Sequence, residues 1–91
     1  HQMARRSEGA VMRGPIYKYP LGTGETEVPG GRILKIGFQA NAPFAWVEVD
    51  INQANRTLVC VPTGLTPPER STYVDSATSD HLVWHYYELH A

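Results

Sequence analysis

The stretch Phe44-Ala45-Trp46-Val47-Glu48-Val49-Asp50-Ile51 alternates strictly between two kinds of side chain. Successive side chains of a β-strand point to opposite faces of a sheet, so this period of two predicts a strand. The aliphatic set, which we expect to face the core, is Ala45, Val47, Val49 and Ile51. The opposite, mixed set is Phe44, Trp46, Glu48 and Asp50.

The rest of the chain repeats this kind of pattern. Seven prolines and eight glycines punctuate the 91 residues, and the runs between them are rich in Val, Ile, Tyr, Trp and Thr. No window places apolar groups at helical spacing without a proline or glycine break. Many short strands separated by turn signals are typical of antiparallel β domains. We therefore predict an all-β fold, a six- or seven-stranded antiparallel sandwich or small barrel.

Turn signals and alternation place the remaining strands. The predicted strands outside 44–51 are 16–19, 25–28, 32–39, 56–61, 71–74 and 81–89. In the strand 32–39, Leu34, Ile36 and Phe38 share the face that we expect to be buried. Residues 52–55 predict a hairpin loop that returns the chain antiparallel. The polar run 75–80 favours a turn.

Length and composition favour one domain with an arm. We predict a flexible arm over residues 1–14, in which His1-Gln2-Met3 resembles a tag remnant and Met3 or Met12 is the native start. Residues 15–91 form the single β domain. No apolar run reaches the roughly 18 residues that a membrane span needs, so we expect no membrane partner and a place in the cytoplasm.

The charge balance differs between the two parts. The arm carries Arg5, Arg6 and Arg13 against Glu8, whereas the domain carries five basic and eight acidic side chains. The domain is therefore mildly acidic, which argues against a nucleic-acid surface.

The side chains with chemical potential do not form a recognisable site. His81 and His85 lie two steps apart on one strand face, about 13 Å, too far to share one zinc ion at about 2 Å per ligand. Cys60 lies in an apolar run and is expected to act as a small hydrophobe. We predict no catalytic residue, no metal ligand and no cofactor. A small enzyme using His85 with Glu48 or Asp50 is an alternative.

The nine aromatic residues are too many for a core of this size. Phe38 and Trp84 are the predicted core members. An exposed patch for a partner is predicted from Tyr17, Tyr19, Phe44, Trp46, Tyr86 and Tyr87. Such patches mark interaction surfaces, with Trp and Tyr as typical anchors. Two alternatives stay open: the rings complete both faces of the core, or they stack the bases of single-stranded nucleic acid.

Six blocks of sequence support a resemblance. They are Ile16–Leu21, Pro29–Leu34, Pro43–Asp50, Thr63-Gly64, Tyr73-Val74 and Leu82–His85. On these blocks the chain resembles a family of small phage, prophage and plasmid proteins of unknown activity. The resemblance implies a compact β domain of phage origin and supplies no catalytic residue. Members usually carry His after Thr-Gly, where this chain has Leu65.

These observations lead to one functional expectation. We expect a non-enzymatic phage protein that binds a protein in the host cytoplasm, either a host factor or further copies of itself. Fold and origin carry this expectation by analogy. A single-stranded nucleic-acid-binding β-barrel is the first alternative, and the small enzyme with His85 is the second.

Overall fold

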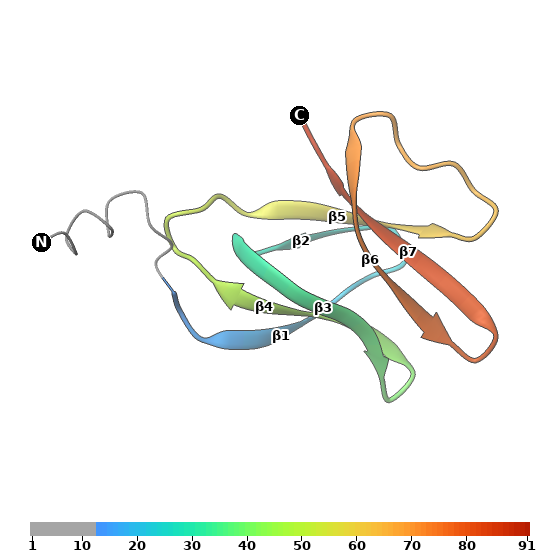
Figure 1. Cartoon of the computed structure of the whole chain (residues 1–91), viewed down its shortest axis with the longest axis horizontal. Helices are drawn as coiled ribbons and strands as arrows, with labels where there is room; N and C mark the ends of the chain where they lie inside the picture. The colour runs from blue at the N-terminus through green and yellow to red at the C-terminus, as the bar shows by residue number, and fades with distance from the viewer. Residues whose placement is uncertain (1–12) are drawn as a thin grey trace, which may run out of the picture.

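The computed structural model describes residues 13–91 as seven strands without a helix (Figure 1). The strands are β1 (Ile16–Pro20), β2 (Glu25–Val28), β3 (Gly31–Gln39), β4 (Ala42–Val49), β5 (Arg56–Pro62), β6 (Ser71–Ser79) and β7 (Leu82–Leu89). They form an antiparallel three-stranded sheet, β1-β4-β3, and an antiparallel four-stranded sheet, β2-β5-β7-β6. The all-β prediction is confirmed, with two sheets and seven strands.

None of the residues that the structure describes belongs to a helix long and apolar enough to span a bilayer. Residues 1–12 of the predicted arm lie outside the described residues. The last two arm residues contact the fold, because Gly14 donates a backbone hydrogen bond to Val49 and Arg13 pairs with Glu48.

The core lies between the two sheets. Its buried cluster is Leu21, Val28, Ile36, Ala45, Val47, Leu58, Ala77 and Tyr86. The predicted core aromatics Phe38 and Trp84 are half-buried and pack against this cluster, as does Cys60. Val47 and Ala45 are fully buried, as the alternation of β4 predicted.

Ile51 does not belong to the aliphatic face of β4, because the strand ends before it. The buried Asp50 accepts hydrogen bonds from the backbone nitrogen of Asn52 (3.0 Å) and from Nε2 of Gln53 (2.9 Å). These bonds turn the chain, so Ile51 points into solvent with 82% of its surface exposed. The loop that follows is no hairpin, because β4 and β5 belong to different sheets.

Leu34 is also wrongly assigned to the core, since a β-bulge interrupts the alternation of β3. Ile33 pairs with Val47 and Lys35 pairs with Trp46, which leaves Leu34 as an extra residue. An extra residue reverses the faces on either side of it. Leu34 is therefore 42% exposed while Ile36 is buried.

A second bulge lies on β6, where Val74 is the extra residue between Tyr73 and Asp75. Strands β3 and β6 are the neighbouring edges of the two sheets, and Figure 1 shows the β3–β4 and β6–β7 hairpins close together. There Asp75 accepts a hydrogen bond from the backbone nitrogen of Ile36 (2.9 Å). The polar run 75–79 is strand rather than the predicted turn because its side chains have partners of this kind.

Candidate functional site

The structure separates the six aromatic residues that were predicted to form one patch. They divide among four places: the inner side of β1, the core and the outer face of each of the two sheets. Residues directly opposite each other in an antiparallel pair share a face, so the register decides these positions. No single patch contains all six.

Tyr86 is the clearest correction. Its side chain is 2% exposed and belongs to the buried cluster, because β7 directs Trp84 and Tyr86 toward the other sheet. Burial, followed by a hydrogen bond to the side chain of Cys60, raises the pKa of the Tyr86 hydroxyl well above its usual value. The hydroxyl stays neutral and inside the protein, so Tyr86 is no surface anchor.

Tyr17 and Tyr19 lie on the inner side of β1. They pair with Val47 and Ala45, which are buried, and their rings meet edge to face with centroids 6.3 Å apart. Tyr19 packs against the core, while Tyr17 is 54% exposed at the open edge of the sheet. This pair therefore points away from Trp46.

Phe44 and Trp46 lie together on the outer face of the three-stranded sheet. Their ring centroids are 6.3 Å apart. The ammonium group of Lys18 lies 4.6 Å from the centroid of Phe44, and that of Lys35 lies 5.9 Å from the centroid of Trp46. Lysines in this position make favourable cation–π contacts. Half-buried rings thus lie between exposed cations from the strands on either side.

Further charged side chains lie on this outer face. Arg32 of β3 lies opposite Glu48 of β4 in the strand register. The Glu48 carboxylate accepts a 2.9 Å bond from Nε of Arg13. We call this surface the cationic face; it comprises Arg13, Lys18, Arg32, Lys35, Phe44, Trp46 and Glu48. It holds four of the six Lys and Arg side chains of residues 13–91 but one of their eight carboxylates.

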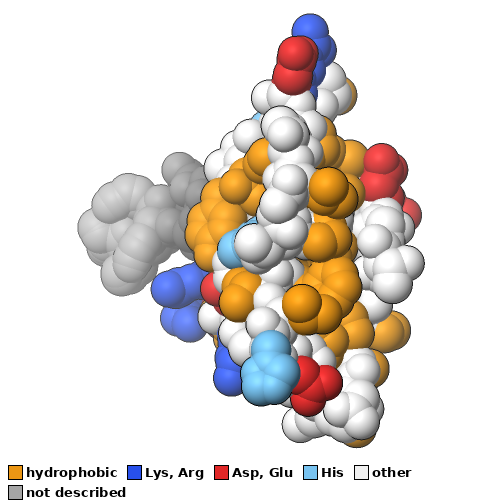
Figure 2. Space-filling view, turned by 90° about the vertical axis from the view of Figure 1, so that its right-hand side faces the viewer, with side chains coloured by type: hydrophobic (Ala, Val, Ile, Leu, Met, Phe, Trp, Pro, Cys, Tyr) orange, Lys and Arg blue, Asp and Glu red, His pale blue; other side chains and the backbone are white. Residues whose placement is uncertain are grey.

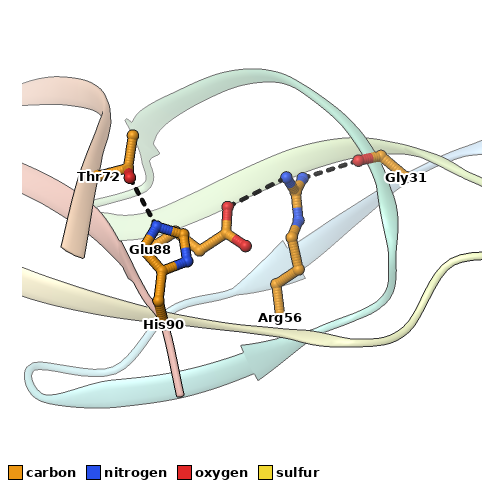
Figure 3. Close-up of polar contacts among 5 residues, drawn as sticks. All are labelled: Gly31, Arg56, Thr72, Glu88 and His90. Atoms are coloured by element: carbon orange, nitrogen blue, oxygen red, sulfur yellow. Dashed lines mark hydrogen bonds and ion pairs between the residues drawn. The ribbon is translucent and has the colours of Figure 1, made fainter. Parts of the chain in front are cut away.

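A cleft of about 600 Å³ adjoins the cationic face. Arg13, Arg32 and Glu48 line it from one sheet, and Glu88 lines it from the other. Arg56 bridges the sheets there: its guanidinium donates to the carbonyl oxygen of Gly31 (2.8 Å) and to Glu88 (3.3 Å), as Figure 3 shows. Beside them, Oγ1 of Thr72 lies 2.6 Å from Nε2 of His90.

Arg56 is held in this cleft by its terminal nitrogens, one of which contacts the backbone of Gly31. Its Nε atom is buried and has no hydrogen-bond partner among the described residues, so the side chain is held by its two terminal nitrogens alone. Gly31 has a φ of +137°, a conformation that suits glycine, and a Cβ there would lie 2.2 Å from the backbone oxygen of Glu48. The close approach of β3 to β4 thus aims the Gly31 carbonyl at Arg56.

His85 lies on the outer face of the four-stranded sheet and is not joined to Glu48 or Asp50. Its Nδ1 is 2.8 Å from the hydroxyl of Ser76, and its Nε2 is 2.9 Å from the hydroxyl of Thr63. Glu48 instead pairs with Arg13, and Asp50 caps the turn after β4. The predicted acid–base pair is not assembled.

The hydrogen bonds around His85 define its tautomer. Thr63 donates its single proton to the carbonyl oxygen of Val83 (2.9 Å), so it accepts from Nε2–H of the ring. Ser76 then donates to Nδ1 and accepts from the Tyr73 hydroxyl (2.7 Å). Ser76 thus bonds one ring nitrogen of His85, as the serine of a catalytic triad does. The other ring nitrogen bonds Thr63, whereas in a triad it bonds a carboxylate. The chain of bonds therefore positions side chains on the sheet surface.

Around this histidine the outer face is apolar. The rings of Tyr73 and Tyr87 meet edge to face at 5.6 Å, and Val83 lies one step from His85. We call this surface the apolar face; it comprises Val59, Val61, Tyr73, Ser76, Val83, His85 and Tyr87. Tyr73 and Val83 are exposed, Val61 is buried and the others are half-buried. No Lys or Arg of the four strands points to it, since Arg56 shares the inner side with Leu58.

Figure 2 views the molecule from the side where the β6–β7 hairpin and residues 63–70 lie. Hydrophobic side chains spread across this side, and Lys and Arg appear at its rim. Leu65, in the loop between β5 and β6, is 66% exposed, and Tyr73 of β6 is 52% exposed. Within residues 13–91, no three His, Cys, Asp or Glu side chains gather closely enough to hold a metal ion.

Comparison with known proteins identifies a family. Residues 12–91 match the model described as Domain of unknown function (DUF7352). The chain belongs to this family. No curated protein and no solved structure matches the chain. The match covers all seven strands and both outer faces.

Sequence reasoning missed the cationic face and the pairing of Tyr73 with Tyr87. Lys18 and Lys35 occur far apart in the sequence, and only the register places both beside Trp46. The one available signal was their alternation with apolar residues in β1 and β3. Two blocks of the family resemblance, Thr63-Gly64 and Leu82–His85, meet in the hydrogen bond between Thr63 and His85.

Proposed function

We propose that this chain is a non-enzymatic protein-binding module that acts in the cytoplasm of a bacterial host through its apolar face. The observation that supports this proposal is the outer face of the four-stranded sheet, where Tyr73 and Val83 are exposed beside the half-buried Tyr87. Contiguous exposed apolar surface is typical of interaction sites, and tyrosines are frequent anchors there. The six aromatic residues of the sequence prediction contribute one member, Tyr87.

Exposure and packing make Tyr73 and Val83 suitable anchors. Tyr73 is 52% exposed, and its ring is held by Tyr87 and its hydroxyl by Ser76. A side chain that is already held loses little conformational freedom when a partner binds. Val83 is 37% exposed beside Thr78 on the same face.

The charges around this face define the chemistry of the partner. Glu25 and Glu27 lie at its β2 edge, opposite Val59 and Thr57 of β5. Complementary charge at the rim of an interface favours encounter and orientation. The partner is therefore a protein with an apolar centre and Lys or Arg side chains along one side.

The test places a charge on the apolar face. Val83→Asp should abolish co-purification of the partner from host cells, because an unpaired carboxylate would be buried in the interface. Leu82→Asp is the matched control, since Leu82 is 58% exposed but points to the other side of β7. Circular dichroism and thermal melting check that both variants fold.

Light scattering at two concentrations shows whether the partner is a second copy of the chain. A mass that rises with concentration and falls with Val83→Asp supports the proposal equally. Equal capture by wild type, Val83→Asp and Leu82→Asp would refute it. So would a monomeric wild-type chain that captures no protein.

A further inference from the structure

We propose that the cationic face is a second, independent site that binds single-stranded nucleic acid. Two neighbouring bases stack on Phe44 and Trp46, and the phosphates between and beside them contact Lys18, Lys35 and Arg32. The inference stands on the geometry of the three-stranded sheet and does not depend on the apolar face.

The spacing of the rings favours a single strand over a duplex. The centroids of Phe44 and Trp46 are 6.3 Å apart. Their ring planes are tilted by 58° to each other. Neighbouring bases in a duplex are nearly parallel and about 3.4 Å apart, so they lie flat on both rings only after they unstack. Unstacked bases are available in single strands, where aromatic side chains are their usual platforms.

The two lysines are positioned to contact phosphate on either side of each base. Their ammonium groups lie 4.6 Å from the Phe44 centroid and 5.9 Å from the Trp46 centroid. A base that stacks on a ring displaces the ammonium group over that ring, and a four-carbon side chain lets the group move to a phosphate. The Lys18 ammonium group also donates a hydrogen bond to Oε1 of Gln39. Binding therefore exchanges two cation–π contacts and this hydrogen bond for two base stacks and two ion pairs.

Gly37 leaves space beside the rings. It pairs with Phe44, and a Cβ at this position would lie 3.2 Å from Cε of Lys35 and 3.8 Å from Cζ3 of Trp46. Any side chain here would push Lys35 or cover the edge of the indole. Glycine in a strand often marks such a close approach of a ligand.

The cleft continues this surface. Arg13 and Arg32 belong to both, and Arg56 lies deeper in the cleft. Its volume of about 600 Å³ is within the range of small-molecule sites, so it has room for a further nucleotide. The cations thus follow one path from Phe44 to the junction of the sheets.

The acidic charge of the whole domain does not oppose this site. Six of the eight carboxylates of residues 13–91 lie away from both the cationic face and the cleft, including the buried Asp50 and the exposed Glu25 and Glu27 of the opposite sheet. The other two are paired, Glu48 with Arg13 and Glu88 with Arg56. Exposed charges separated by more than a Debye length, about 8 to 10 Å, are largely screened. The local field over Phe44 and Trp46 is therefore positive.

The test measures fluorescence anisotropy of labelled twelve-nucleotide oligothymidine and oligouridine with the full chain, and a duplex of equal length is the comparison. We expect the single strands to bind more tightly than the duplex. Three phosphate contacts, from Lys18, Lys35 and Arg32, predict an affinity that falls about twenty-fold between about 50 and 200 mM salt. Trp46→Ala should weaken binding about ten-fold, the value of one lost base stack.

Three variants separate the site from general effects. Lys18→Glu with Lys35→Glu should remove most binding and flatten the salt dependence, whereas Trp46→Phe should retain a ring and most of the affinity. Val83→Asp, on the apolar face, should bind oligonucleotide like the wild type. Thermal melting confirms that each variant is folded.

Several results would overturn the inference. Failure of the wild type to bind oligonucleotide at about 50 mM salt would overturn it. So would a Trp46→Ala variant that binds as tightly as the wild type. Equal affinity for duplex and single strand would also reject it. If no oligonucleotide binds but an acidic protein is captured and lost with Lys18→Glu, the face binds protein instead. Each of these outcomes leaves the test of Val83→Asp unaffected.

Discussion

At the scale of single residues, Tyr86 shows how burial sets the chemistry of a side chain. The same strand directs Tyr86 into the core and Tyr87 to the apolar face, although the two are neighbours in the sequence. The Tyr86 hydroxyl has a raised pKa because burial disfavours the phenolate and because it bonds Cys60. Tyr86 therefore stays protonated in the folded protein at pH values where a solvated tyrosine ionises.

This raised pKa predicts an alkaline loss of stability. The unfolded chain releases the Tyr86 proton near pH 10, whereas the folded chain retains it to a higher pH. The stabilising contribution is complete below pH 10 and is lost as the pH rises from there toward the folded pKa, by about 1.4 kcal/mol per pH unit. Denaturant unfolding between about pH 8 and 11 measures it.

Tyr86→Phe provides the comparison for this prediction. The variant has no phenol to ionise at this position, so its free energy of unfolding should fall less steeply above pH 10. The absolute stability of the variant is not the test, because the lost bond to Cys60 also changes it. Identical slopes for wild type and Tyr86→Phe would contradict the prediction.

At the scale of elements, two bulges decide which side chains reach the core. Leu34 and Val74 are the extra residues of β3 and β6, and each lies at the edge where the sheets meet. A bulge bends its strand and increases its twist, which helps the two edges to approach. The cost is that the alternation before the bulge does not continue after it.

The bulge predicts unequal losses of stability when two similar aliphatic residues are replaced by alanine. Ile36→Ala should lower the free energy of unfolding by about 2 to 4 kcal/mol, because Ile36 is 2% exposed and its loss leaves a cavity. Leu34→Ala should cost less than about 1 kcal/mol, since Leu34 is 42% exposed. Urea unfolding of both variants checks this, and equal losses would show that Leu34 belongs to the core.

At the scale of the whole molecule, side chains rather than strand pairing join the two sheets at their common edge. Asp75 accepts the backbone N–H of Ile36 across the junction and that of Ser76 within its own strand. Arg56 makes a second connection, from the carbonyl oxygen of Gly31 to Glu88. The outer faces of the two joined sheets differ in charge. One is the cationic face, and the other is the apolar face, to which no Lys or Arg of the strands points.

Removing the Asp75 carboxylate should weaken this junction. Asp75→Ala leaves the amides of Ile36 and Ser76 without their acceptor, which should cost about 2 kcal/mol of unfolding free energy. Amide hydrogen exchange at Ile36 should accelerate in the same variant. Glu69→Ala, in the exposed loop before β6, is the control and should stay within about 0.5 kcal/mol of wild type. Unchanged exchange at Ile36 would show that Asp75 does not secure the junction.

Local patterns in the sequence predicted where the strands lie better than they predicted which side chains from other strands surround them. The alternation around Val47 and the absence of helical spacing both appear in the structure. Between β3 and β4 the chain turns at Ala40-Asn41, where both residues have positive φ. The run 75–79 was missed because Asp75 and Ser76 look like turn residues. Their partners, Ile36 and His85, come from other strands.

The candidate sites were less predictable for the same reason. Trp46 was singled out from the sequence, but its cationic neighbours Lys18 and Lys35 were not. Cross-strand neighbours depend on register, and register depends on pairing between distant segments. The net charge of the domain also concealed the local excess of cations, because a sum over residues contains no positions.

The sequence by itself determined that this protein is a chain of short strands, since alternation and breakers act locally and need no partner. Only the tertiary structure decided which strands pair, which face of each strand is buried and which charges lie together. The physical reason is the two-residue period of a strand. One extra residue such as Leu34 exchanges the two faces, and that choice is made by packing across the sheets rather than by the strand alone.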